Sequence, residues 1–173
     1  LELSPAACAL ADRTAAANGL TDRLITLPCD LRDRRQLPPA GRFDLAVSNP
    51  PYFPAGGGKT AAGSRGIHRA ELACTMEQLC AAAAYLLRSG GQFCLVYRTE
   101  RLAELMETLR RHRLEPKVLR FVQKNAASAP SLLLMACRKD GGTGLTVQPP
   151  LLLQNDDGTE TPELRRIYFK EKG

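Results

Sequence analysis

Phe43-Asp44-Leu45-Ala46-Val47-Ser48-Asn49-Pro50-Pro51-Tyr52 joins a short apolar run to a polar, proline-containing corner. The first six residues of this stretch predict a compact apolar strand over residues 43–48. The strand runs directly into Asn49 and two prolines. Because proline fixes φ and has no N–H donor, we expect a stiff corner whose carbonyl groups stay in place.

This corner carries groups that suit a planar amino group. The side-chain oxygen of Asn49 is one acceptor, and the carbonyl of Pro50 is a second. Tyr52 offers a flat apolar face on which a base can stack, and Phe53 is a candidate to extend that face. The alternative is a proline-rich turn that ends a strand, with Asn49 capping and Tyr52 packing. The apolar strand before the corner favours the first interpretation.

Strands and helices alternate on both sides of the corner. Ser4 and Pro5 begin a predicted helix over residues 6–18, and Thr75 and Thr99 each cap a later helix. Gly90-Gly91 is expected to end the helix that follows Thr75. Further strands are predicted at residues 23–28, 92–97, 117–122 and 132–138. The last two lack a helix between them and should pair antiparallel, so we expect an α/β sheet that is mostly parallel with one reversed strand.

Polar side chains follow three of the predicted strands at the points where they end, namely Glu2, Asp30 and Asn49. In sheets of this kind, ligands bind at the carboxyl ends of the strands. Glu2, followed by Leu3, is placed to accept hydrogen bonds from the ribose hydroxyls of a nucleoside cofactor. Asp30, with Leu31 beside it, is placed to accept one from an adenine amino group.

The composition restricts the partners. The 173 residues suit one domain, and a net charge of +6 favours a polyanion, nucleic acid first, although a solvated basic surface is the alternative. Six cysteines without a C-x-x-C spacing predict reduced thiols in a cytoplasmic protein, and with only two histidines no metal site is expected. The apolar runs are too short to span a membrane, and no secretory signal opens the chain.

Over nearly its whole length the sequence resembles one family of class I methyltransferases. These are the bacterial tRNA adenine-N6 methyltransferases that modify the adenine next to the anticodon of a valine tRNA. The matching stretches are Glu2-Leu3-Ser4, Cys29-Asp30-Leu31-Arg32-Asp33, Phe43-Asp44-Leu45, Ser48-Asn49-Pro50-Pro51-Tyr52-Phe53, Ile67-His68-Arg69-Ala70-Glu71, Arg101-Leu102-Ala103-Glu104-Leu105, Leu119-Arg120-Phe121-Val122 and Thr161-Pro162-Glu163-Leu164. The Asn-Pro-Pro-Tyr motif is shared by many amino methyltransferases, whereas the stretch at 67–71 and the one at 161–164 are more typical of this family.

The resemblance implies a Rossmann-like class I sheet with a C-terminal antiparallel hairpin, S-adenosyl-L-methionine as cofactor and an adenine of tRNA as acceptor. The implied catalytic residues are Asn49, Pro50, Pro51 and Tyr52. The implied cofactor-binding residues are Glu2, Leu3, Asp30, Leu31 and Asn49. Tyr52 and Phe53 are expected to contact the substrate, and charge makes Arg65, His68 and Arg69 candidates for RNA phosphates, unless they form only a solvated basic lid.

The sequence departs from the family at its beginning. The first strand of the family and the Gly-rich turn after it, which cradles the methionine end of the cofactor, are absent from this chain. We therefore expect an N-terminally truncated catalytic domain at residues 1–140 and a family tail at 141–173 that packs on it.

Other functions remain open from the sequence. The corner equally suits an enzyme that methylates the glutamine amide of peptide release factors, and the missing Gly-rich turn favours a non-catalytic RNA-binding module. Gly58-Lys59-Thr60 resembles a phosphate-binding P-loop, but Phe53 stands where the motif needs its first glycine.

Overall fold

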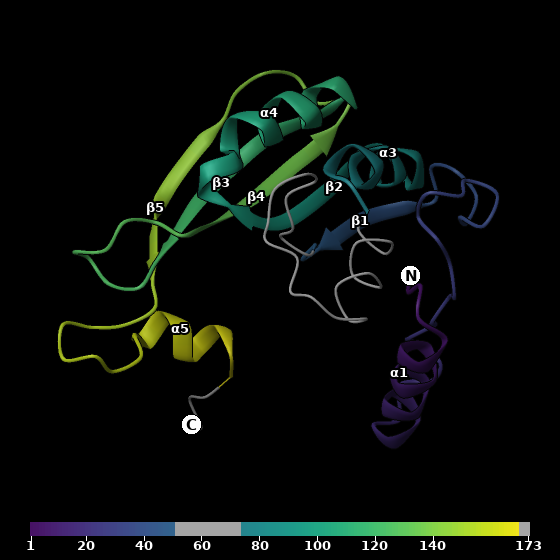
Figure 1. The fold of residues 1–173 in the computed structure, drawn as a ribbon, viewed down its shortest axis with the longest axis horizontal. Helices are drawn as coiled ribbons and strands as arrows, with labels where there is room; N and C mark the ends of the chain where they lie inside the picture. The colour runs from purple at the N-terminus through teal and green to yellow at the C-terminus, as the bar shows by residue number, and fades with distance from the viewer. Residues whose placement is uncertain (51–73, 170–173) are drawn as a thin grey trace, which may run out of the picture.

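The computed structural model describes residues 1–50 and 74–169 (Figure 1). The described helices are α1 (Pro5–Ala17), α3 (Met76–Leu86), the short 3-10 helix η1 (Thr99–Arg101), α4 (Leu102–Arg111) and α5 (Pro162–Ile167). The strands are β1 (Phe43–Ser48), β2 (Leu87–Arg98), β3 (Leu114–Gln123), β4 (Leu132–Lys139) and β5 (Thr146–Leu152). None of the described helices is long and apolar enough to cross a membrane.

The strands form one sheet in the order β1-β2-β4-β3-β5. β1 pairs parallel with β2, and β3 pairs parallel with β5, whereas β4 runs antiparallel to both of its neighbours. Among the described strands, four therefore point the same way and β4 is reversed. This confirms the predicted α/β sheet and the antiparallel pairing of residues 117–122 with 132–138.

Local signals placed the helix starts well, with one exception. Ser4 caps α1, and Thr75 with Gln78 forms a reciprocal capping box at α3. Thr99 does not cap a helix, because it is the first residue of η1, which precedes α4. Its hydroxyl donates to the carbonyl of Pro130 at 2.8 Å.

Two sequence predictions were wrong, one about the end of a helix and one about a strand. The helix that follows Thr75 ends at Leu86, and Gly90-Gly91 lie inside β2, because Leu87 already pairs with Phe43. Residues 23–28 form no strand, because Pro28 has only a single bridge partner, Glu2, on the part of the chain that is described.

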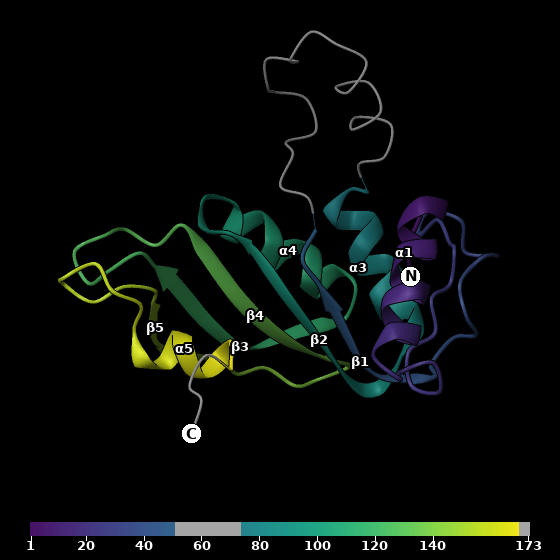
Figure 2. The ribbon, with the colours of Figure 1, turned by 90° about the horizontal axis from the view of Figure 1, so that it is seen from below.

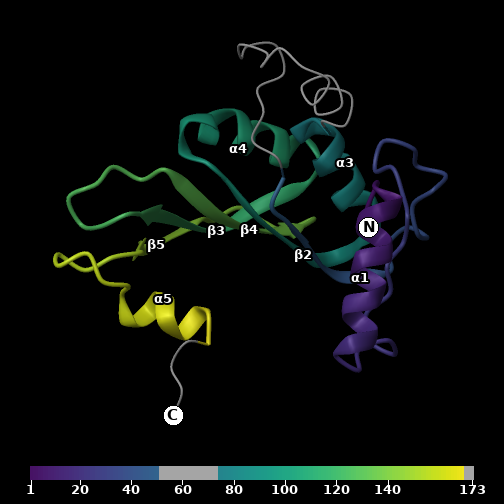
Figure 3. The same ribbon diagram turned by 60° about the horizontal axis from the view of Figure 1, so that its bottom comes forward.

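The core lies between the helices and one face of the sheet. α3 and α4 lie on the same side of the sheet, while α1 and α5 stand at opposite ends of the molecule (Figure 3). Register partners on this face are Phe93 with Cys137 and Leu95 with Met135, and all four are buried. Leu105 and Leu109 of α4 and Cys80 of α3 complete a cluster of fully buried side chains against them.

The other face of the sheet is more open. Cys94, Ala136 and Val118 occupy successive partner positions on β2, β4 and β3, so their side chains share that face. They line a pocket of about 570 Å³ together with Val47 of the edge strand β1, which is 72% exposed. The burial of the sheet is therefore one-sided among the described residues, although the strands are apolar on both faces.

The C-terminal segment is joined to the sheet by β5 and by an ion pair. Arg120 of β3 donates to both carboxylate oxygens of Glu163 on α5, at 2.7 and 2.8 Å, and to the carbonyl of Pro149 in β5 at 2.9 Å. The hydrogen bonds from Arg120 lower the pKa of the Glu163 carboxyl below its usual value. One guanidinium thus connects three elements, while the division at residue 140 stays a prediction.

We expect Glu163→Gln to destabilise the fold by about 1 kcal/mol at pH 7, because it removes the charge from a partly exposed bidentate pair. A carboxyl whose pKa is lower in the folded than in the unfolded chain contributes stability above its unfolded pKa, near 4.3, and loses it as pH falls through the folded value. Urea unfolding should therefore show a deficit at pH 7 that disappears in acid. Asp156→Asn, in the same segment, is the control, and a deficit that persists in acid would contradict the ion-pair explanation.

Candidate active site

The predicted catalytic corner lies at the carboxyl end of the edge strand β1. Ser48 still pairs with Leu95 of β2, and after it Asn49 is exposed and Pro50 is half-buried. The corner is thus accessible and follows a strand of the parallel part of the sheet, as the sequence predicted. The other residues predicted for catalysis or substrate binding lie outside the described ranges, and these are Pro51, Tyr52, Phe53, Arg65, His68 and Arg69.

Two pockets flank the corner, one on each side of the sheet. Asn49 lines the open-face pocket of about 570 Å³, in which Arg120 and Gln148 are further polar residues. Pro50 lines a second pocket of about 280 Å³ between β2, α3 and α4, which we call the helix-side pocket. A ligand in either pocket would therefore border the Asn49-Pro50 peptide.

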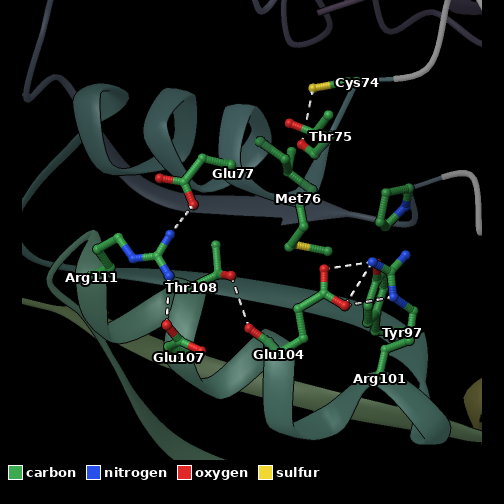
Figure 4. A pocket seen from close by; sticks show the side chains of 12 residues that line it. Cys74, Thr75, Met76, Glu77, Tyr97, Arg101, Glu104, Glu107, Thr108 and Arg111 are labelled. Carbon is green, nitrogen blue, oxygen red and sulfur yellow. Dashed lines mark hydrogen bonds and ion pairs between the residues drawn. The ribbon is translucent and has the colours of Figure 1, made fainter. Parts of the chain in front are cut away.

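The helix-side pocket combines an aromatic ring with charged groups (Figure 4). Tyr97, at the end of β2, is only 4% exposed, and burial raises the pKa of its hydroxyl. The guanidinium carbon of Arg101 lies 5.8 Å from the centre of the Tyr97 ring, and Nε of Arg101 donates to Glu104 at 2.9 Å. Met76, from the first turn of α3, also lines the pocket.

Further ion pairs join the two helices beside this pocket. Arg111 of α4 donates to Glu77 of α3 at 2.9 Å and to Glu107 at 2.7 Å. With Glu104, three carboxylates face two arginines around the helix-side pocket. Because carboxylates outnumber arginines here, the pocket suits a neutral ring with polar edges better than a negatively charged phosphate.

Glu2, one of the predicted cofactor ligands, lies beside the segment that ends in Asp30. The peptide N–H of Glu2 donates to the carbonyl of Leu27 at 3.0 Å, and the N–H of Cys29 donates to the carbonyl of Glu2 at 2.9 Å. Oε1 of Glu2 accepts the N–H of Ser4 at 2.7 Å, which fixes the carboxylate at the start of α1. Leu3 is 37% exposed next to it.

Asp30, the second predicted cofactor ligand, is held by Arg32. The guanidinium of Arg32 donates to both carboxylate oxygens of Asp30 at 2.7–3.0 Å, and these bonds lower the pKa of the carboxyl. Asp30 is therefore an ionised acceptor at neutral pH, and Leu31 after it packs against the core cluster.

The structure brings Glu2 and Asp30 to neighbouring segments but does not unite them with Asn49 in one cavity. Neither carboxylate lines the open-face pocket or the helix-side pocket. All three side chains are hydrogen-bond acceptors, which matches the ribose hydroxyls and the amino group of an adenosyl cofactor. The oxygens of Asp30 already accept from Arg32, so an adenine amino group would have to share or replace these bonds. In residues 1–50 and 74–169, no cluster of side chains could hold a metal ion.

Sequence reasoning missed the lining of the helix-side pocket. Tyr97 was assigned to a buried strand, and Arg101 and Glu104 were noted only within a family-like stretch. Their positions could have indicated a site. Tyr97 lies near the end of a strand that pairs with β1, and Arg101 and Glu104 stand three residues apart in the helical turn that follows.

Comparisons with known proteins give relatives of similar sequence. No family model matches the chain. A tRNA1(Val) (adenine(37)-N6)-methyltransferase from Porphyromonas gingivalis W83 is 29% identical over 172 residues, covering 96% of this chain and 67% of that protein. A protein of the same name from Dickeya chrysanthemi is 27% identical over 161 residues, covering 91% of this chain and 63% of that protein. The chain thus spans about two thirds of the length of these curated relatives.

Solved structures give the fold. A predicted O-methyltransferase from Agrobacterium tumefaciens superposes with a TM-score of 0.76 at 19% identity, covering 96% of this chain and 74% of that one. A geranyl diphosphate C-methyltransferase from Streptomyces coelicolor gives 0.56 at 12% identity, covering 79% and 62%. The chain therefore has the Rossmann-like fold of class I methyltransferases. Its sequence is similar to the curated tRNA1(Val) adenine-N6-methyltransferases named above.

Proposed function

We propose that this chain carries the catalytic part of an S-adenosyl-L-methionine-dependent methyltransferase that methylates the exocyclic N6 amino group of an adenine in tRNA. The observation that carries the proposal is the exposed Asn49-Pro50 corner at the carboxyl end of β1, between two pockets. Homology to proteins named for this reaction supports the choice of acceptor.

The corner supplies what amino-group methylation demands. The lone pair of an adenine amino nitrogen is delocalised into the ring, so alignment of the nitrogen contributes much of the acceleration. Asn49 Oδ1 and the carbonyl of Pro50 would accept the two N–H bonds and favour the pyramidal, partly positive nitrogen that forms as the new bond is made. A strong base is unnecessary, because the nitrogen loses its proton readily once it is methylated. Pro51 would stiffen the corner by its fixed φ, and Tyr52 and Phe53 would stack on the base.

S-adenosyl-L-methionine, when bound, supplies an electrophilic methyl group on a sulfonium. Glu2 and Leu3 would hold its ribose side, while Asp30 and Leu31 would hold its adenine side. The ionised state of Asp30 supports the role of acceptor for an amino group. Arg65, His68 and Arg69 remain candidates for contacts to RNA phosphates, on the basis of their charge.

The test is methyl transfer from labelled cofactor to unmodified tRNA and, in parallel, to a peptide release factor. We expect label in tRNA, recovered as N6-methyladenosine after digestion to nucleosides. Label found only in the release factor would replace this proposal by the glutamine amide reaction. RNA binding without incorporation of label, in protein that binds the cofactor, would replace it by a binding module.

A further inference from the structure

A third pocket lies on the outer side of α3, away from both pockets at the corner. It is a groove of about 620 Å³ between residues 31–41, helix α3 and the turn that joins α4 to β3. Small side chains of α3, including Ala81 and Ala84, form its floor together with Tyr85. The blue segment that precedes β1 lies at the same end of the molecule as α3 (Figures 1 and 2). We call this feature the basic groove.

The charges that line the basic groove have one sign. Arg32 and Arg34 stand on one side and Arg113 and Lys139 on the other, and no described lining residue is an aspartate or a glutamate. Asp30 and Asp140 partly neutralise Arg32 and Arg113 from outside the groove. Arg34 and Lys139 have no carboxylate within ion-pair distance among the described residues. The helix-side pocket, by contrast, is lined by three carboxylates and two arginines.

The two cations without a carboxylate partner are held in place. The guanidinium carbon of Arg34 lies 4.2 Å from the centre of the Tyr85 ring, so the group stacks on the ring. Stacking uses the face of the guanidinium and leaves the N–H donors at its edge for phosphate oxygens. Lys139 Nζ donates to the carbonyl of Leu87 at 2.7 Å, which positions its charge at the other side of the groove.

We propose that the basic groove binds the phosphate backbone of the RNA substrate, an inference that rests on the proposed function. The neutral polar side chains of the groove have partners already, since Gln78 accepts the N–H of Thr75 at 2.9 Å and His112 contacts Glu77 at 2.7 Å. The cations are therefore the main groups offered to a ligand, and their contacts would position an RNA rather than select a sequence. Thr75, which caps α3, lines the helix-side pocket beside Pro50, so α3 leads from the corner along the groove over about 16 Å. A duplex carries a negative charge every ~1.7 Å of its axis, so several phosphates would face this length.

The experiment compares RNA binding by the chain and by Arg34→Gln/Lys139→Gln, using fluorescence anisotropy with labelled tRNA at several salt concentrations. Loss of two phosphate contacts should weaken binding and reduce the slope of log affinity against log salt by about 1.4–1.8. Arg165→Gln/Arg166→Gln in α5 makes the same change of charge at the far end of the molecule and should have no such effect. Arg34→Gln alone, with half the effect, replaces the double variant if thermal unfolding shows that Lys139→Gln does not fold.

Equal losses in both double variants, or no loss in either, would overturn the basic groove as the binding surface. Competition by polyglutamate as effective as that by unlabelled RNA would overturn RNA as its occupant. Methyl transfer is measured on the same preparations. Groove-dependent RNA binding without methyl transfer would reject the proposed function alone, whereas methyl transfer with an unchanged KM for tRNA in the groove variant would reject the groove alone.

Discussion

Asn49→Ala is expected to lower the rate of methyl transfer to tRNA by about two orders of magnitude while cofactor affinity stays unchanged. The loss follows from removing one of two fixed acceptors at the nitrogen where positive charge develops, and groups of this kind are worth about 10²–10³ in rate. Asn49 is exposed at the end of an edge strand, so its truncation leaves no buried cavity. Single-turnover kinetics with saturating tRNA, together with calorimetry of cofactor binding, measure the two quantities separately.

Two further variants make the Asn49 result specific. Asn49→Asp keeps an acceptor oxygen on the same carbon and should retain more activity than Asn49→Ala. Asn18→Ala, a matched change at the C-cap of α1, should leave turnover unaltered. Turnover close to that of the unmodified protein in Asn49→Ala would remove Asn49 from the reaction, while equal loss of cofactor affinity and turnover would assign it to cofactor binding instead.

Leu133→Ala is expected to destabilise the fold by about 2–5 kcal/mol, the range for a large side chain removed from a packed core. Leu133 has no exposed surface and stands in register between Tyr97 on β2 and Phe121 on β3. Its side chain faces the layer of α3 and α4. Truncation would therefore leave a cavity inside the core, closed to solvent. Urea unfolding monitored by circular dichroism gives the change in the free energy of unfolding.

Leu134 is the matched control, since it is the next residue of the same strand and points to the open face. Leu134→Ala should lose less than half as much stability, because this half-buried leucine has fewer neighbours to lose. Equal losses at the two positions would show that the second face of the sheet is covered in solution and would contradict the one-sided burial described above.

Several features of the fold followed from local chemistry. The apolar run over residues 43–48 became β1 with the predicted bounds, and the caps at Ser4 and Thr75 formed as expected. Thr99 is not a cap because it lies inside η1, and its hydroxyl donates to the carbonyl of Pro130, 31 residues away. Such a contact has no local sequence signal.

The candidate site also has parts that follow from local sequence and parts that depend on contacts between distant segments. The catalytic role of Asn49 and Pro50 stays a prediction. Their position at the end of a strand could be predicted from the sequence, because the apolar run before them specifies that strand. The helix-side pocket and the basic groove could not, because each is formed by elements far apart in the chain. Arg34 meets Tyr85 only when residues 31–41 lie along α3, and Pro50 meets Tyr97 only when β1 pairs with β2.

Residue type and spacing thus determine where β1 and the caps at Ser4 and Thr75 arise in this protein, since these depend on backbone preferences within a few residues. Tertiary structure alone decides which charges share a pocket. Asp30 faces Arg32, its neighbour in sequence, whereas Lys139 reaches the basic groove through the reversed strand β4. The physical reason is that electrostatic and packing energies depend on distances in space, which the order of residues specifies only after the sheet has formed.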